Sequence, residues 1–150
     1  MNSKVKFTVA RISITLLFLI VTMLQILSFP GQITHMRDKN SWGLVFEISL
    51  LILVVSWMLT AQLALVNIWK IISHMEREAF FTTTCIALIN NLLKCFAGAI
   101  TIPISMFALL APQADDPGFF VLLTAVTLFI ATLYTLVRLL RDQLVQKIPE

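Results

Sequence analysis

Lys94 is the residue whose type and position could most directly do chemistry. It lies about eight residues into a long apolar segment, residues 86–110. An ionisable side chain within a membrane span faces protein or water by default and marks a functional hypothesis. The alternative is a positional role, in which the long side chain reaches back to the headgroup region. The sequence leaves both interpretations open.

Polar and small side chains form a stripe along the segment that carries Lys94. They follow one another at alternating steps of three and four residues, which places them on one face of a helix. Such side chains let membrane helices approach closely and hydrogen-bond across the contact. We therefore expect this face to lie inside a helix bundle, or else to line a polar pathway for a solute or ion. Its members are Asn91, Lys94, Gly98, Thr101, Ser105 and Ala108.

Two other apolar segments carry comparable stripes. Their spacing again predicts one helix face each. If Lys94 lies inside a bundle, Thr60 and Asn67 are its expected hydrogen-bond partners. The stripe in residues 43–69 comprises Ser49, Ser56, Thr60 and Asn67, and that in residues 119–137 comprises Thr124, Thr127, Ala131 and Thr135, continued by Arg138 and Asp142.

Glu47 falls in the first turn of the second expected helix, where the helix dipole favours a carboxylate. It lies at the opposite depth from Lys94, so we do not expect the two to pair directly. A role as a ligand or proton site is the alternative to this dipole role. The candidate intramembrane polar site therefore comprises Lys94, Asn91, Thr60, Asn67 and Glu47.

Other reactive patterns are missing from the sequence. Asp115 and Asp116 share a short turn and supply too few of the 6–8 oxygens that calcium takes. Cys85 and Cys95 are ten residues apart in one expected helix, so ~15 Å separates them, too far for a disulfide. No nucleophile motif or glycine-rich phosphate loop occurs. We expect no metal, no cofactor and no enzymatic activity.

The elements that must position these residues are four long apolar segments. They run over residues 12–29, 43–69, 86–110 and 119–137, and each reaches the ~18 to 20 residues that cross a bilayer. The apolar fraction is 59% and the charged fraction 13%, against roughly 25% charged in soluble domains. The sequence thus predicts an all-α fold, a single domain over residues 1–150 with four transmembrane helices in a bundle.

The basic residues predict which way the helices cross. Eight of them flank the segments on one side, and the other side has only Arg37 and Lys39. The positive-inside rule therefore places both termini and the middle loop in the cytoplasm. The net charge of +3 follows from this distribution, so we expect lipid and not nucleic acid as the contact of these cations. The eight are Lys4, Lys6, Arg11, Lys70, Arg77, Arg138, Arg141 and Lys147.

The cytoplasmic side offers a candidate docking surface of mixed charge. Such a surface recognises a partner by complementarity. The alternative is that these residues anchor helix ends to anionic lipid, each contributing roughly 1 kcal/mol. The candidate residues are Lys70, Glu76, Arg77, Glu78, Arg138 and Arg141.

Four short stretches resemble the domain of unknown function 2975 family, a group of uncharacterised bacterial four-helix membrane proteins. Residues 66–70 (VNIWK) are similar to the end of the family's second helix, and Phe81-Thr82 to the start of its third. Residues 114–118 (ADDPG) resemble its short outer turn, and residues 137–143 (VRLLRDQ) the basic end of its fourth helix. Where the family usually has basic residues, positions 83–86 read TTCI, and the tail ending at Glu150 is shorter than is common.

The resemblance implies a multi-pass protein of the bacterial inner membrane with small helix-turn-helix regulators as neighbours, but no activity. We expect a non-enzymatic accessory or sensory protein that acts through a cytoplasmic partner such as a regulator of that kind. A small transporter or channel lined by the polar faces is the alternative, and a homo-oligomer stays open. If the function of the protein depends on Lys94 or Glu47, conduction is favoured. If it depends on the residues of the cytoplasmic face, docking is favoured.

Overall fold

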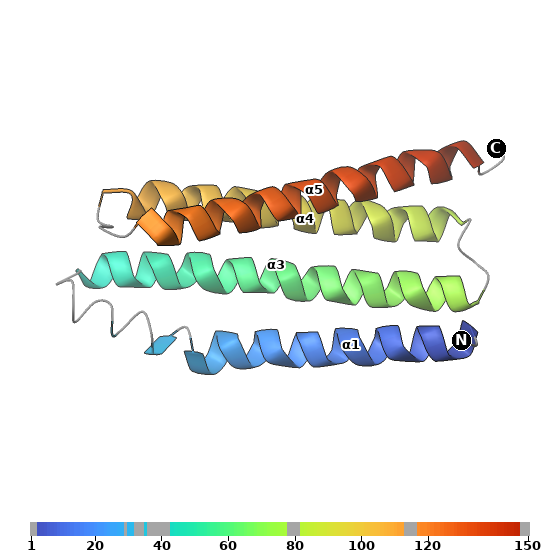
Figure 1. Cartoon of the computed structure of the whole chain (residues 1–150), viewed down its shortest axis with the longest axis horizontal. Helices are drawn as coiled ribbons and strands as arrows, with labels where there is room; N and C mark the ends of the chain where they lie inside the picture. The colour runs from blue at the N-terminus through green and yellow to red at the C-terminus, as the bar shows by residue number, and fades with distance from the viewer. Residues whose placement is uncertain are drawn as a thin grey trace.

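The computed structural model describes residues 3–28, 30, 31, 35, 43–77, 82–112 and 117–147. Within them the chain forms four long helices that lie side by side with alternating directions (Figure 1). They are α1 (Ser3–Met23), which continues into the π-helical turn η1 (Leu24–Ser28), α3 (Leu44–Glu76), α4 (Thr83–Leu110) and α5 (Pro117–Lys147). The described residues contain no strand, so the predicted all-α fold with four helices is confirmed.

All four helices are long and apolar enough to cross a membrane. All four extend beyond the apolar segments that indicated them, because capping and helix-forming polar residues carry the helix past the apolar limit. In α4, the Thr82 hydroxyl accepts a hydrogen bond from the Cys85 N–H at 3.3 Å and begins the helix at Thr83. In α3 and α5 the extra turns carry charged side chains and end at Glu76 and Lys147.

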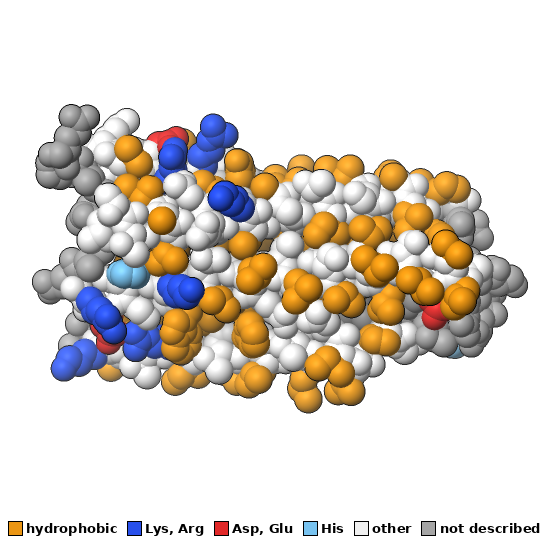
Figure 2. All heavy atoms as spheres, turned by 180° about the vertical axis from the view of Figure 1, so that it is seen from behind, with side chains coloured by type: hydrophobic (Ala, Val, Ile, Leu, Met, Phe, Trp, Pro, Cys, Tyr) orange, Lys and Arg blue, Asp and Glu red, His pale blue; other side chains and the backbone are white. Residues whose placement is uncertain are grey.

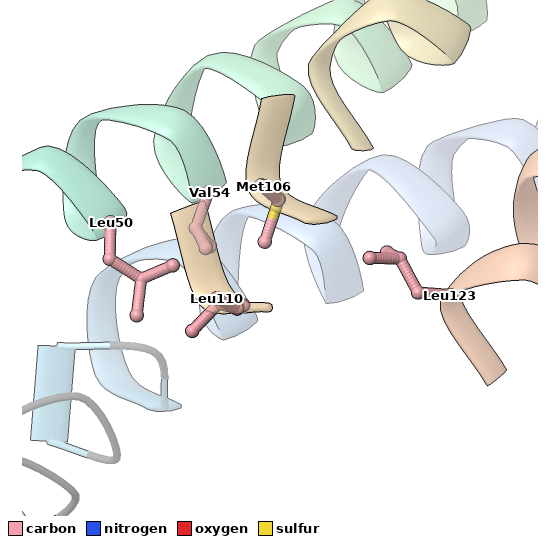
Figure 3. Close-up of a cluster of buried hydrophobic side chains, with 5 residues drawn as sticks. All are labelled: Leu50, Val54, Met106, Leu110 and Leu123. Carbon is pink, nitrogen blue, oxygen red and sulfur yellow. The ribbon is translucent and has the colours of Figure 1, made fainter. Parts of the chain in front are cut away.

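Helix α3 lies between its neighbours. It packs most extensively against α4, α4 packs against α5, and the principal contact of α1 is with α3. The cores between these helices are apolar, and no described side chain of α1 is buried. Figure 3 shows the cluster of Leu50, Val54, Met106, Leu110 and Leu123, contributed by α3, α4 and α5. A second cluster at the end with both termini comprises Cys85, Ile89 and Leu144, with Ile71 and Val137 packed against it.

A proline inside α4 determines how α3 and α4 are joined. Pro103 is buried and has no N–H, so the Ala99 carbonyl lacks its usual helical donor four residues on. The indole N–H of Trp57 in α3 donates to that carbonyl at 3.0 Å. Beside it, a Cβ built on Gly98 would lie 3.4 Å from the Thr60 Cγ2, so the absence of a side chain lets the helices approach. The sequence alone assigned no role to Trp57.

The Trp57–Ala99 hydrogen bond should be needed only because residue 103 is proline. Replacing Trp57 with phenylalanine should lower the free energy of unfolding by about 1–2 kcal/mol, since it leaves a part-buried acceptor unpaired. In a Pro103→Ala background the restored N–H satisfies Ala99, and the same change should cost less. Reversible unfolding in mixed micelles measures this double-mutant cycle. Equal costs in both backgrounds would show that the bond contributes nothing.

Candidate functional site

Most described lysines and arginines gather at one end of the molecule. Because α1 runs opposite to α3 and α5, its N-terminus lies beside their C-termini (Figure 1). Figure 2 shows these side chains over that end. We call it the basic end, and its described cations are Lys4, Lys6, Arg11, Lys70, Arg77, Arg138, Arg141 and Lys147. Glu47 lies at the opposite end, in the first turn of α3, where the sequence placed it.

Arg11 ties α1 to α3 at the basic end. Its Nη2 lies 2.5 Å from the Glu76 Oε2 and donates to the Ser73 hydroxyl at 3.3 Å. Its guanidinium carbon lies 5.6 Å from the centre of a Trp69 ring. The three α3 residues share one face at steps of four and three. We call Arg11, Trp69, Ser73 and Glu76 the Arg11 clamp.

In the described part of the chain, the clamp is one of two polar side-chain contacts that join α1 to α3. Farther along the helix, the Gln62 amide donates to the Thr22 hydroxyl at 2.9 Å. The side chains of Arg11 and Glu76 are 33% and 38% exposed, so solvent screens their ion pair. The sequence showed the spacing of Trp69, Ser73 and Glu76 but not that Arg11 would face them, because the register between two helices is not a local property.

The remaining candidate docking residues are mainly cationic. Arg141 pairs with the neighbouring Asp142 at 2.9 Å, and Glu76 is held by the clamp. Lys70, Arg77 and Arg138 are exposed and make no ion pair with any described residue. Glu78 lies outside the described residues. The described part of this surface therefore presents positive charge, where the sequence suggested an alternating pattern.

Most of the polar stripe of α4 faces away from the bundle, and Gly98, which packs against Thr60 of α3, is the exception. Asn91, Lys94, Thr101, Ser105 and Ala108 are exposed. The buried face of α4 lies on the other side of the helix and includes Cys85, Ile89, Leu92, Ala99 and Met106. The expectation that this stripe packs inside the bundle is thus wrong for a single chain. The apolar residues take the interior because burying them is favourable and burying an ammonium or amide is costly.

Lys94 does not bond to its expected partners. The Thr60 hydroxyl donates to the Trp57 carbonyl at 2.7 Å. The Asn67 amide donates to the Leu63 carbonyl at 2.8 Å and lies 3.9 Å from the Cys95 sulfur. Lys94 itself is exposed and has no hydrogen bond or ion pair to another described residue. This geometry fits the positional role, with the side chain free to reach toward the headgroup region.

Apart from the contact of Thr60 with Gly98, the described residues of the polar stripes make no shared polar interior. Hydroxyls in all three donate to carbonyls of their own helices, as Ser49 does to Val45 at 2.8 Å and Thr127 to Leu123 at 2.7 Å. Among the described residues no polar or charged side chain is buried. The same residues contain no group of three His, Cys, Asp or Glu side chains that could hold a metal ion. Asp115 and Asp116 lie outside them.

Over residues 8–147 the chain matches the family described as protein of unknown function (DUF2975). The chain belongs to this family, which confirms the resemblance seen in its short motifs. No curated protein matches the chain. No solved structure matches it either.

The Arg11 clamp should couple Arg11 to Glu76 energetically. Arg11→Gln and Glu76→Gln should each lower thermal stability in detergent, and the double variant should lose less than the sum. We expect a coupling of about 0.5–1 kcal/mol for a pair of this exposure. Arg141→Gln is the matched control, because its partner Asp142 is adjacent on the same helix and joins no second one. Strictly additive effects would rule the coupling out.

Lys94→Met should leave the free energy of unfolding in detergent within about 0.5 kcal/mol of the wild type, as for other surface changes. Gly98→Leu is the control on the same helix. Because Gly98 packs against Thr60, that change should destabilise the protein by about 1–3 kcal/mol. If Lys94→Met lowered the free energy of unfolding as much as the control does, Lys94 would be bonded within the protein.

Proposed function

We propose that this member of the family is a non-enzymatic accessory or sensory protein of the bacterial cell membrane that acts through a protein docked at its basic end. The observation that carries the proposal is the gathering of cations from three helices at the end where both termini lie. The positive-inside rule places that end in the cytoplasm. Four helices of sufficient length and apolarity support the membrane location.

Docking at the basic end is favoured because the two ends of the molecule differ in the surface that they offer to a protein partner. At the basic end, three helices extend past their apolar segments and carry exposed charged side chains. At the opposite end the stretches between the expected spans are residues 30–42 and 112–117, most of which lie outside the described residues. A protein partner needs a standard contact of roughly 800 Å² on each side, which favours the end where several helices carry exposed charged side chains. The basic end is therefore the better candidate surface.

The transport alternative has less support in the arrangement of the polar residues. Conduction needs polar groups that line a common path. In the described part of the chain the stripe of α4 faces outward and the core is apolar. A path would then have to form between copies of the chain. An enzymatic role would need a reactive constellation, and we propose none.

Site-specific photo-cross-linking in intact cells tests the docking proposal. A cross-linking residue at Met75 or Gln143, both exposed at the basic end, should give a discrete protein adduct. Val45, exposed at the opposite end, is the matched control and should give none. A reporter fused after Glu150 should read as cytoplasmic. If neither basic-end position captures a protein, the docking proposal fails and transport becomes the leading candidate.

A further inference from the structure

The unpaired cations of the basic end lie at two depths along the helices. Lys70 and Arg138 directly neighbour Ile71 and Val137, which pack against the cluster around Cys85. We call these two the inner pair. The outer group lies beyond the last contacts between helices, since Arg77 follows the clamp residue Glu76, and Lys147 follows the buried Leu144. The outer group comprises Lys4, Lys6, Arg77 and Lys147.

Helix geometry gives the distance between the two depths. Arg77 is seven residues beyond Lys70 on the path of α3, and Lys147 is nine beyond Arg138 in α5. At 1.5 Å per residue these separations are about 10 and 13 Å. Lys4 precedes Arg11 by seven residues in α1 and so lies about 10 Å from Arg11 along the helix axis.

The distance between the two depths can be compared with the thickness of the lipid headgroup layer, because only cations within that layer can be neutralised by lipid phosphate. A headgroup layer is roughly 5–8 Å thick on each side of the hydrocarbon. The inner pair lies beside side chains that pack against the apolar cluster of Cys85, Ile89 and Leu144, so in a bilayer it would be the nearer of the two groups to lipid phosphate. Arg77 and Lys147 lie about 10 and 13 Å beyond the inner pair, which is more than the thickness of that layer, so they would face the aqueous side where the inner pair meets the phosphates.

The two described carboxylates of the basic end are already engaged. Glu76 accepts from Arg11 and Asp142 from Arg141, so neither is free to neutralise the outer group. Within the described residues the four cations of that group make no ion pair. They come from α1, α3 and α5, so a complementary partner must present negative charge over more than one helix end.

We propose that the outer group binds an acidic segment of a cytoplasmic protein, while the inner pair contacts lipid phosphate. This inference rests on the proposed docking function and gives the chemistry of its partner. Complementary charge accelerates encounter and excludes partners of the wrong sign. Binding through exposed charges is also weakened by salt, because ions screen them over about 8–10 Å.

A peptide of alternating glutamate and serine, labelled with a fluorophore, is the probe. The full chain is placed in nanodiscs of phosphatidylcholine and the affinity is measured by fluorescence anisotropy. Arg77→Gln with Lys147→Gln removes one arginine and one lysine of the outer group. Lys70→Gln with Arg138→Gln is the matched control, with the same residue types on the same two helix paths. Thermal unfolding of both variants verifies that they fold.

The outer variant should weaken peptide binding at least roughly fivefold, as expected for two exposed ion pairs, and the inner variant should change it less than twofold. Raising the salt concentration should weaken binding to the wild type. Equal losses in both variants, or no binding to the wild type at low salt, would overturn the inference. Loss of peptide binding when phosphatidylglycerol is added to the nanodiscs would overturn it in favour of lipid at the outer group.

The cellular cross-linking experiment separates this inference from the function on which it rests. A protein adduct at Met75 or Gln143 that disappears with Arg77→Gln and Lys147→Gln supports both. An adduct of unchanged yield in that variant supports docking but overturns the acidic partner. The absence of any adduct overturns docking itself.

Discussion

The hydrogen bond from the Trp57 indole to the Ala99 carbonyl is the contact on which the arrangement of the helices depends. Pro103 removes the donor that this carbonyl would have within α4, and leaving this part-buried carbonyl unpaired costs about 1–2 kcal/mol. Supplying the donor from α3 fixes the depth at which the two helices meet. The other helices then attach to this pair, α1 to α3 and α5 to α4.

Helix α1 is long and apolar enough to cross a membrane, and in lipid it would be held in place differently from a helix in water. None of its described side chains is buried, and Ile12, Leu16 and Ile20 are more than half exposed. In water such a surface would drive association, but lipid tails are as apolar as these side chains. Specific polar contacts therefore decide where α1 lies, and they are the Arg11 clamp and the Gln62–Thr22 hydrogen bond.

Because neighbouring helices are antiparallel, charged residues that are far apart in the sequence lie together at one end of the molecule. Lys4, Arg77 and Lys147 are far apart in the sequence, yet each follows or precedes the last packed turn of its helix at the same end. The ion pairs of Arg11 and Arg141 engage Glu76 and Asp142, so the described part of this surface is left cationic. The charge of this surface therefore depends on which of its residues form ion pairs with one another, and not only on the composition of the loop and tail.

The sequence by itself determined the number, type and approximate limits of the helices, and the gathering of cations at one end. Apolar run length and charge beside a span are local properties, so the four helices, Glu47 and the basic flanks could be placed without a structure. Only the tertiary structure decided which helix faces are inside. The stripe of Lys94 faced outward because apolar side chains of α4 were better buried, and Arg11 met Glu76 because register depends on packing between distant segments.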